Sequence, residues 1–143
     1  MTAIIKPHGG VLCNLVVPEN ENKKLKKDSL NYKSLTLNDR QLCDLEMLLN
    51  GSFSPLKGFL NREDYEGVLN KLRLEDGTVW PMPINLDVAK EFSSDLKSGD
   101  KIALRDHEGV ALAILTISDI WTPDKAEEAQ KVFGTTDEKH PAV

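Results

Sequence analysis

Three histidines are the first residues to test for chemistry, because imidazole is a common general base and metal ligand near neutral pH. They stand at His8, His107 and His140, too far apart for the HExxH or HxH spacing that could hold a metal ion. His107 falls in a four-residue polar stretch that reads as a turn, where a lone histidine is far more often a surface residue than a base. The histidines therefore predict neither a metal site nor a catalytic base.

Carboxylates and hydroxyls give no stronger signal. Asp44 and Glu46 stand two positions apart in a predicted helix, where they point to different faces and make a poor general acid/base pair. We interpret them as part of a solvated face. Ser52 and Ser54 have no neighbouring histidine in the sequence and no nucleophile-elbow motif around them. We assign no catalytic residue to this chain.

Phosphate-binding and thiol motifs are also missing from the sequence. It contains neither GxxxxGK[ST] nor GxGxxG, the common glycine-rich phosphate cradles. Cys13 and Cys43 are thirty positions apart without a CxxC motif, which indicates neither a zinc site nor a redox pair. We expect both thiols to be reduced and partly buried. The sequence thus predicts no metal and no cofactor-binding residue.

Charge limits the partners that the chain can have. Its formal net charge is −5, which argues against general binding to nucleic acids or to a membrane surface. A basic cluster of four lysines between positions 23 and 27 is the exception, and RNA binding is its alternative reading. We interpret it as a solvated loop, because no arginine or aromatic residue is interleaved with the lysines. With no targeting or membrane-spanning pattern, we expect a cytoplasmic protein.

The elements that would position these residues begin irregularly. Val11–Val17 is a candidate strand, followed by the lysine-rich loop. Ser34–Leu37 predicts a short strand, and Asn38 with Gln41 has the spacing of a capping box. We therefore predict a helix of about twelve residues after Asn38, with leucines along one face and an end at Asn50-Gly51.

A second helix and a strand are predicted in the middle of the chain. Asn61 can cap the helix. Asp76-Gly77 predicts a turn, and alternation of apolar residues predicts a strand over Met82–Val88. Pro83 would place that strand at an edge or a bulge. The apolar face of the helix would comprise Tyr65, Val68, Leu69 and Leu72.

The last third predicts a hairpin and a helix. Lys101–Arg105 alternates, 106–109 reads as a turn, and Val110–Ile117 is apolar on both faces, as in a central strand of a closed sheet. Thr122-Pro123 is typical of a helix start, and the helix should end near Gly134. The predicted fold class is α+β: a small mixed or antiparallel β-barrel with flanking helices.

Several segments are not required by helix or strand rules. The most specific is G-x-F-S-P-L-x-G-F over Gly51–Phe59, preceded by D-L-E at Asp44–Glu46. On these residues the sequence resembles the N-terminal domain of sulfate adenylyltransferase, also called ATP sulfurylase, over nearly the whole chain. The other segments that carry the resemblance are Pro7–Gly10, Arg40–Cys43, Asn50, Asp64-Tyr65, Trp80–Val88 and His140–Val143.

The resemblance implies a PUA-like barrel with helices, in agreement with the fold class above. It implies that residues 1–143 are a single such domain, with 1–33 as an irregular N-terminal part and 134–143 as a lead-in to an absent catalytic domain. The family forms adenosine 5'-phosphosulfate and pyrophosphate from ATP and sulfate in sulfate assimilation. Its substrate-binding motif, Q-T-R-N-P-x-H-x-x-H, lies in a following nucleotidyltransferase domain and does not occur here.

Partners and roles follow from the resemblance. We expect the chain to be inactive alone, to contain no catalytic residue, and to pair with the catalytic nucleotidyltransferase domain in cis or in trans, within a homo-oligomer. A free-standing PUA-like binding module and one half of a split enzyme remain alternatives. The Gly51–Leu60 loop would be a tight turn over buried rings, or a support for a neighbouring domain or subunit. If Phe53 or Phe59 is core, its replacement by alanine should cost about 3 kcal/mol. Trp80 and Trp121 are expected in the core or at a rim.

Overall fold

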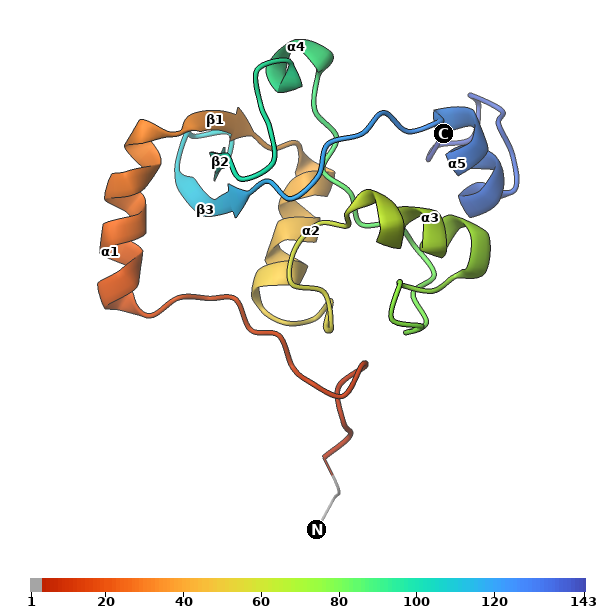
Figure 1. Cartoon of the computed structure of the whole chain (residues 1–143), viewed down its shortest axis with the longest axis horizontal. Helices are drawn as coiled ribbons and strands as arrows, with labels where there is room; N and C mark the ends of the chain where they lie inside the picture. The colour runs from red at the N-terminus through yellow and green to blue at the C-terminus, as the bar shows by residue number, and fades with distance from the viewer. Residues whose placement is uncertain (1–3) are drawn as a thin grey trace. The chain divides into compact units, whose positions relative to one another are not determined.

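The computed structural model describes residues 4–143, which form two compact units, each built from two separate stretches of the chain. Unit 1 takes the chain through Phe59 together with Val88–Ser118, and unit 2 takes Leu60–Asp87 with Asp119–Val143. Figure 1 traces the path of the chain through both. The expectation of one domain over 1–143 stays a prediction, and its first three residues lie outside the described part.

A three-stranded mixed sheet forms in unit 1. Its strands are β1 (Lys33–Thr36), β2 (Lys101–Arg105) and β3 (Ala111–Thr116), in the order β1-β2-β3. β1 runs parallel to β2, and β3 runs antiparallel to it. Three successive residues of β2, Ile102, Ala103 and Leu104, are at most 2% exposed. The predicted strands at 34–37 and 101–105 are therefore confirmed, and the mixed sheet with separate helices confirms the α+β fold class.

The hairpin between β2 and β3 also matches its prediction. Gly109 N donates to Asp106 O at 3.1 Å, and Asp106 N donates to Val110 O at 3.1 Å, which closes the turn. The central position predicted for the 110–117 strand is wrong, because β2 is the strand paired on both sides. β3 lies at an edge of this sheet, and most of its residues are half-buried.

Helix α2 (Asp39–Leu49) begins and ends where the sequence predicts. Asn38 accepts from Gln41 N, and Gln41 Oε1 accepts from Asn38 N, so the capping box is complete. The helix stops at Asn50, and Gly51 follows with φ at +85°. Leu45 and Leu48 on its apolar face are 5% and 2% exposed.

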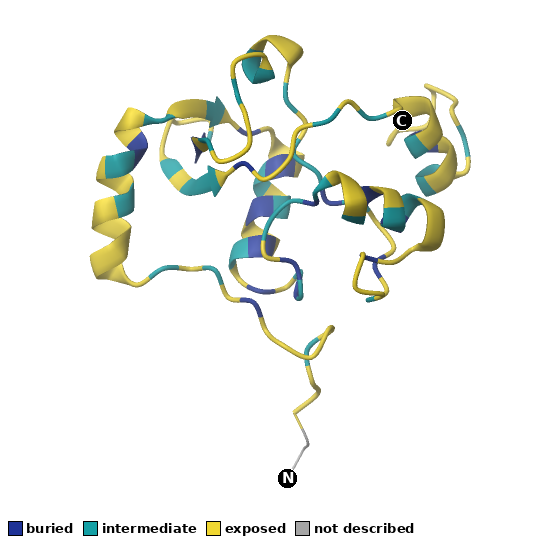
Figure 2. Ribbon diagram, in the orientation of Figure 1, coloured by how far each residue is buried: buried dark blue, intermediate teal, exposed yellow. Residues whose placement is uncertain are grey.

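The N-terminal part of unit 1 differs from its prediction. The lysine-rich segment is not a loop but helix α1 (Glu19–Asp28), followed by the 3-10 turn η1 (Ser29–Asn31). Figure 2 shows α1 almost entirely exposed. The strand predicted over Val11–Val17 is also wrong, since this segment is extended but pairs with no strand. Its backbone N–H groups donate instead to the Ser54 side chain, from Cys13, and to the last residue of α2, from Leu15.

Two basic side chains connect segments of unit 1 that are distant in sequence. Lys33 Nζ donates to Phe92 O at 2.7 Å and to Asp95 Oδ1 at 2.6 Å, which fastens the short helix α4 (Lys90–Ser93) to the start of β1. Arg105 Nε donates to Ser34 Oγ at 2.8 Å across the parallel strands. These bonds hold the edge strand β1 to α4 and to β2.

Unit 2 contains helices α3 (Arg62–Lys71) and α5 (Lys125–Phe133). Asn61 caps α3 by accepting from Asp64 N, as predicted. Asp124, and not Thr122, caps α5, because its carboxylate accepts from Ala126 N and Glu127 N. α5 ends at Gly134 with φ at +73°, which confirms that prediction.

The apolar face of α3 is shorter than predicted. Tyr65 and Val68 are buried and Leu69 is half-buried, whereas Leu72 is 52% exposed. Leu72 ends α3 in the left-handed conformation, with φ at +53°, which turns its side chain off that face. The Asp76-Gly77 turn that follows is confirmed by the bond from Gly77 N to Leu74 O at 2.9 Å.

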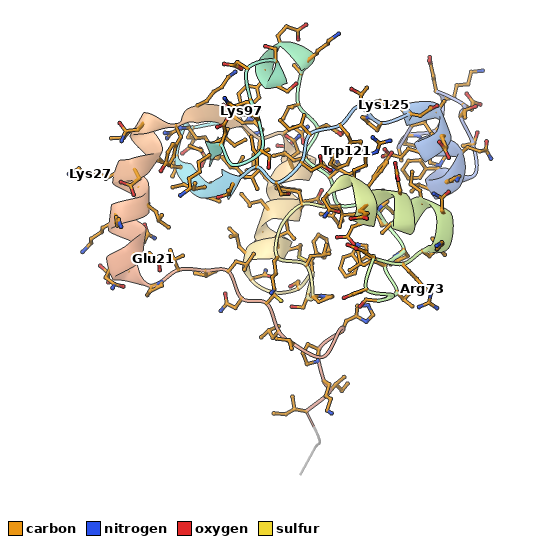
Figure 3. All side chains as sticks on the ribbon, viewed as in Figure 1. Glu21, Lys27, Arg73, Lys97, Trp121 and Lys125 are labelled. Atoms are coloured by element: carbon orange, nitrogen blue, oxygen red, sulfur yellow. The ribbon has the colours of Figure 1, made fainter. Side chains whose placement is uncertain are left out.

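An aromatic pair joins α3 to the stretch before α5. The rings of Tyr65 and Trp121 lie 5.5 Å apart, and Tyr65 Oη donates to Glu128 Oε2 at 2.6 Å. Trp121 is labelled in Figure 3. Burial, together with this hydrogen bond to a carboxylate, raises the pKa of Tyr65. Trp80 is 8% exposed and belongs to the core of unit 2, and Trp121 is half-buried, in line with their expected places.

The strand predicted over Met82–Val88 is wrong. This segment has no regular secondary structure, and only Ile84 within it is buried. Pro83 within the segment and Pro81 just before it carry no backbone N–H, so this stretch lacks donors that a strand pairing needs. Ile84 O accepts from Leu60 N at 2.9 Å, which joins the two ends of this stretch of unit 2.

Within residues 4–143, no helix combines the length and the apolar character needed to cross a bilayer.

Candidate functional site

The Gly51–Phe59 segment forms a tight loop at the end of α2. Phe53 N donates to Met47 O at 3.1 Å, Ser54 N donates to Gly51 O at 3.0 Å, and Leu56 N donates to Phe53 O at 2.8 Å. The peptide bond between Ser54 and Pro55 is cis. These successive bonds give the loop a defined shape without helix or strand.

Ser54 is the side chain that ties this loop to the N-terminal part of unit 1. It is 4% exposed, its Oγ donates to Gly51 O at 2.6 Å, and the same oxygen accepts from Cys13 N at 2.8 Å. Both the donor and one acceptor site of the hydroxyl are therefore used within the fold. Ser54 is a structural link, consistent with the absence of a nucleophile motif around it.

Replacing Ser54 by alanine should lower the free energy of unfolding by about 1–3 kcal/mol, because Cys13 N–H would lose its acceptor inside the fold. Chemical denaturation of the chain measures this change. Ser52→Ala is the matched control, since Ser52 is exposed two positions away and its replacement should change stability by less than about 0.5 kcal/mol. Equal effects of the two replacements would contradict the role given to Ser54.

The Pro7–Gly10 segment packs directly on the same loop. Gly9 has φ at +73°, and a Cβ atom built there would lie 2.7 Å from Pro55 Cγ, too close for any other residue type. Cys13 Sγ lies 3.4 Å from Pro55 O. Pro7–Gly10 and Gly51–Phe59, which helix and strand rules did not require, are thus parts of one structural feature.

The aromatic rings of the loop are less buried than a core role requires. Phe53 and Phe59 are both half-buried, while Leu56 between them is 6% exposed. Leu56 is therefore the core residue of the loop. The loss of about 3 kcal/mol that applies to a core phenylalanine is accordingly too large for Phe53 and Phe59.

The candidate chemical residues are not brought together. His107 Nε2 lies 3.0 Å from Asp39 Oδ1 in unit 1, with side-chain exposures of 60% and 95%. His140 stacks on Phe133 in unit 2, with the ring centres 5.4 Å apart. In the described part of the chain, no group of three or more His, Cys, Asp or Glu side chains is arranged to hold a metal ion.

Two expectations about single side chains on α2 and near it need correction. Asp44 is not solvated, since its side chain is only 15% exposed and accepts from Arg40 Nη1 at 2.9 Å. Burial raises the pKa of Asp44, and the Arg40 charge partly opposes that rise. Cys13 is buried, but Cys43 is exposed and not partly buried as expected; both are free thiols.

The four lysines of the basic cluster lie on helix α1. All four are exposed, and Lys23 pairs with Glu19 at 3.2 Å one turn away. Lys27 and Glu21 are labelled on this helix in Figure 3. The solvated loop predicted for the cluster is therefore wrong: the lysines are solvated but helical, and lysine, leucine and glutamate are all good helix formers. The cluster comprises Lys23, Lys24, Lys26 and Lys27.

Comparison with known proteins gives several close relatives. The chain is 48% identical over 141 residues to the sulfate adenylyltransferase of Eremothecium gossypii, covering 98% of this chain and 28% of the relative. It is 50% identical over 140 residues to the sulfate adenylyltransferase of Kluyveromyces lactis, covering 96% of this chain and 28% of the relative. It is 50% identical over 141 residues to the sulfate adenylyltransferase of Neurospora crassa, covering 96% of this chain and 24% of the relative. The chain thus spans about a quarter of the length of these relatives.

A solved structure has the same fold. The hexameric APS kinase from Thiobacillus denitrificans superposes with a TM-score of 0.77 at 43% sequence identity, over 85% of this chain and 24% of that one. The profile of the PUA-like domain family matches residues 5–143, almost the whole chain. With the α+β architecture described above, this match shows that the chain belongs to the PUA-like domain family.

Proposed function

We propose that this chain is the N-terminal, non-catalytic domain of a sulfate adenylyltransferase, the enzyme that forms adenosine 5'-phosphosulfate and pyrophosphate from ATP and sulfate. One observation carries the proposal: identity of 48–50% extends over 96–98% of this chain, yet covers only about a quarter of each sulfate adenylyltransferase relative. Such identity over the whole chain supports a shared role for this quarter of the enzyme.

The arrangement of side chains supports a non-catalytic role. Ser54 is engaged in backbone bonds, the His107–Asp39 pair lies at the surface, and Asp44 is paired with Arg40. We therefore propose that the chain makes no product alone and holds no cofactor. Its partner is the catalytic nucleotidyltransferase domain, in cis or in trans, in a cytoplasmic homo-oligomer.

A hybrid enzyme tests this function. The hybrid consists of this chain followed by the part of the Kluyveromyces lactis relative that lies outside the match. Sulfate-dependent release of pyrophosphate from ATP should be measurable for the hybrid and absent for the 143-residue chain alone. Turnover by the chain alone, or a hybrid no more active than that part of the relative without this chain, would contradict the proposal.

RNA binding is the second candidate function, favoured by the exposed lysines of α1. We expect no specific binding, because acidic residues flank the lysines and the whole chain has a net charge of −5. Filter binding of single-stranded RNA across a salt series measures it. Affinity that weakens steeply with salt, and is lost when all four lysines become glutamine, would favour the binding module over the enzyme domain.

A further inference from the structure

The chain before α1 belongs to unit 1, and its side chains from Leu12 to Val17 alternate between exposed and covered positions. We call residues 4–17 the N-terminal arm. From Leu12 to Val17, burial alternates: Cys13, Leu15 and Val17 are buried or half-buried, and the residues between them are exposed. Alternation of this kind is what an extended segment gives when one face rests on a core and the other faces outward.

Backbone bonds hold the arm in this position. Cys13 N donates to Ser54 Oγ at 2.8 Å, and Leu15 N donates to Leu49 O at 2.9 Å. Gly10 N donates to Pro7 O at 2.9 Å, and Gly9 packs on Pro55. From Pro7 onward, the exposed side chains of the arm are therefore presented from a backbone that hydrogen bonds hold in place (Figure 1).

The outward set is apolar except for Asn14, whose side chain accepts from Val16 N at 3.0 Å. Leu12 and Val16 are each 62% exposed and Val11 is 65% exposed, although Val11 and Leu12 follow directly on the anchored Gly9-Gly10 turn. Ile4 and Ile5 at the start of the arm are 96% and 90% exposed. Lys6 is the one charged residue in the sequence from 4 to 17, in a chain where 29% of residues are charged. A group of exposed apolar side chains on a segment with a single charge is typical of a surface that another protein part covers.

We propose that the outward face of the arm, formed by Val11, Leu12 and Val16 with Ile4 and Ile5, is the docking surface for the remaining three quarters of the sulfate adenylyltransferase chain. This inference rests on the proposed function. The relatives carry this quarter within one longer polypeptide. A domain tethered to this one acts at millimolar effective concentration, and so displaces a second copy of the chain from the same apolar surface.

Cysteine labelling tests the docking surface. In a Cys43→Ser background, which removes the exposed native thiol, single Leu12→Cys and Val16→Cys variants report on the arm and Leu30→Cys serves as a control. Leu30 is 77% exposed in unit 1 outside the arm. Maleimide should label all three positions readily in the isolated chain. In the hybrid enzyme, the labelling rates at positions 12 and 16 should fall by a factor of about ten or more, and the rate at position 30 should not change.

Paired polar substitutions give an independent measurement. Leu12→Ser/Val16→Ser should lower the melting temperature of the hybrid by more than that of the isolated chain, because both side chains are 62% exposed there, although Leu12 also lies against Gly51. Leu30→Ser/Val110→Ser makes the same chemical change at other exposed positions of unit 1 and should lower neither.

The outcomes separate this inference from the proposed function. An active hybrid in which positions 12 and 16 label as fast as in the isolated chain would overturn the docking surface and leave the function standing. Concentration-dependent dimerisation of the isolated chain that Leu12→Ser/Val16→Ser abolishes would also overturn it, in favour of a second copy. Protection of the arm in an inactive hybrid would support the surface while contradicting the function.

Discussion

Replacing Leu104 by alanine is expected to lower the free energy of unfolding of the chain by about 3–5 kcal/mol. Leu104 is 1% exposed and lies on β2, which pairs with β1 on one side and β3 on the other. Truncation therefore leaves a cavity in the central strand, where the paired neighbours cannot move to fill it. Both the lost burial and the cavity act in the same direction.

Denaturant unfolding followed by tryptophan fluorescence and circular dichroism measures the loss. Leu30→Ala is the matched control, since Leu30 is 77% exposed and its truncation should change stability by less than about 0.5 kcal/mol. A loss below about 1 kcal/mol for Leu104→Ala would mean that β2 is not the packed centre of unit 1.

Replacing Gly67 by alanine should destabilise the chain, although the same change inside most helices stabilises by about 1 kcal/mol. Gly67 lies in α3, and a Cβ atom there would lie 2.5 Å from the backbone oxygen of Arg73. The chain folds back over Gly67 after Leu72, so the clash is with backbone that cannot rotate away. We expect a loss of about 1–3 kcal/mol from this overpacking.

Gly58→Ala provides the control for Gly67→Ala. No atom lies within 4 Å of a Cβ built at Gly58, and its φ is not in the left-handed region. Its replacement should change the melting temperature little, whereas Gly67→Ala should lower it. Stabilisation by Gly67→Ala would show that the segment after α3 does not return over this helix.

Elements with local signals could be predicted from the sequence. The capping box of Asn38 and Gln41 and the 106–109 turn each depend on residues within four positions of one another, and both formed as expected. The strand predicted over Met82–Val88 did not form, because alternation suggested a strand while Pro83, with Pro81 just before the segment, removed backbone donors. Helix α1 was missed because it buries no residue and so leaves no apolar periodicity to detect.

The candidate site was predictable only in part. Unusual residue combinations drew attention to Pro7–Gly10 and Gly51–Phe59, but nothing in their spacing said that they touch. The contact is the packing of Gly9 on Pro55, and it is accompanied by a hydrogen bond from Cys13 to Ser54, which are 41 positions apart. The strand predicted over Val11–Val17 did not form, although burial alternates from Leu12 to Val17. The hydrogen-bond partners of this segment are a serine side chain and a helix end, which no local pattern encodes.

The parallel pairing of β1 with β2 delays the formation of the sheet during synthesis, because β2 is made long after β1. Ser34 pairs with Ala103, so 69 positions (103 minus 34) are added before the partner of β1 exists. At about 5–20 residues per second, β1 waits about 3–14 seconds. The first stretch of unit 2 is made within that interval, before unit 1 can close. Nascent chains of this length therefore expose an unpaired strand, which is prone to aggregation, between the emergence of β1 and that of β2.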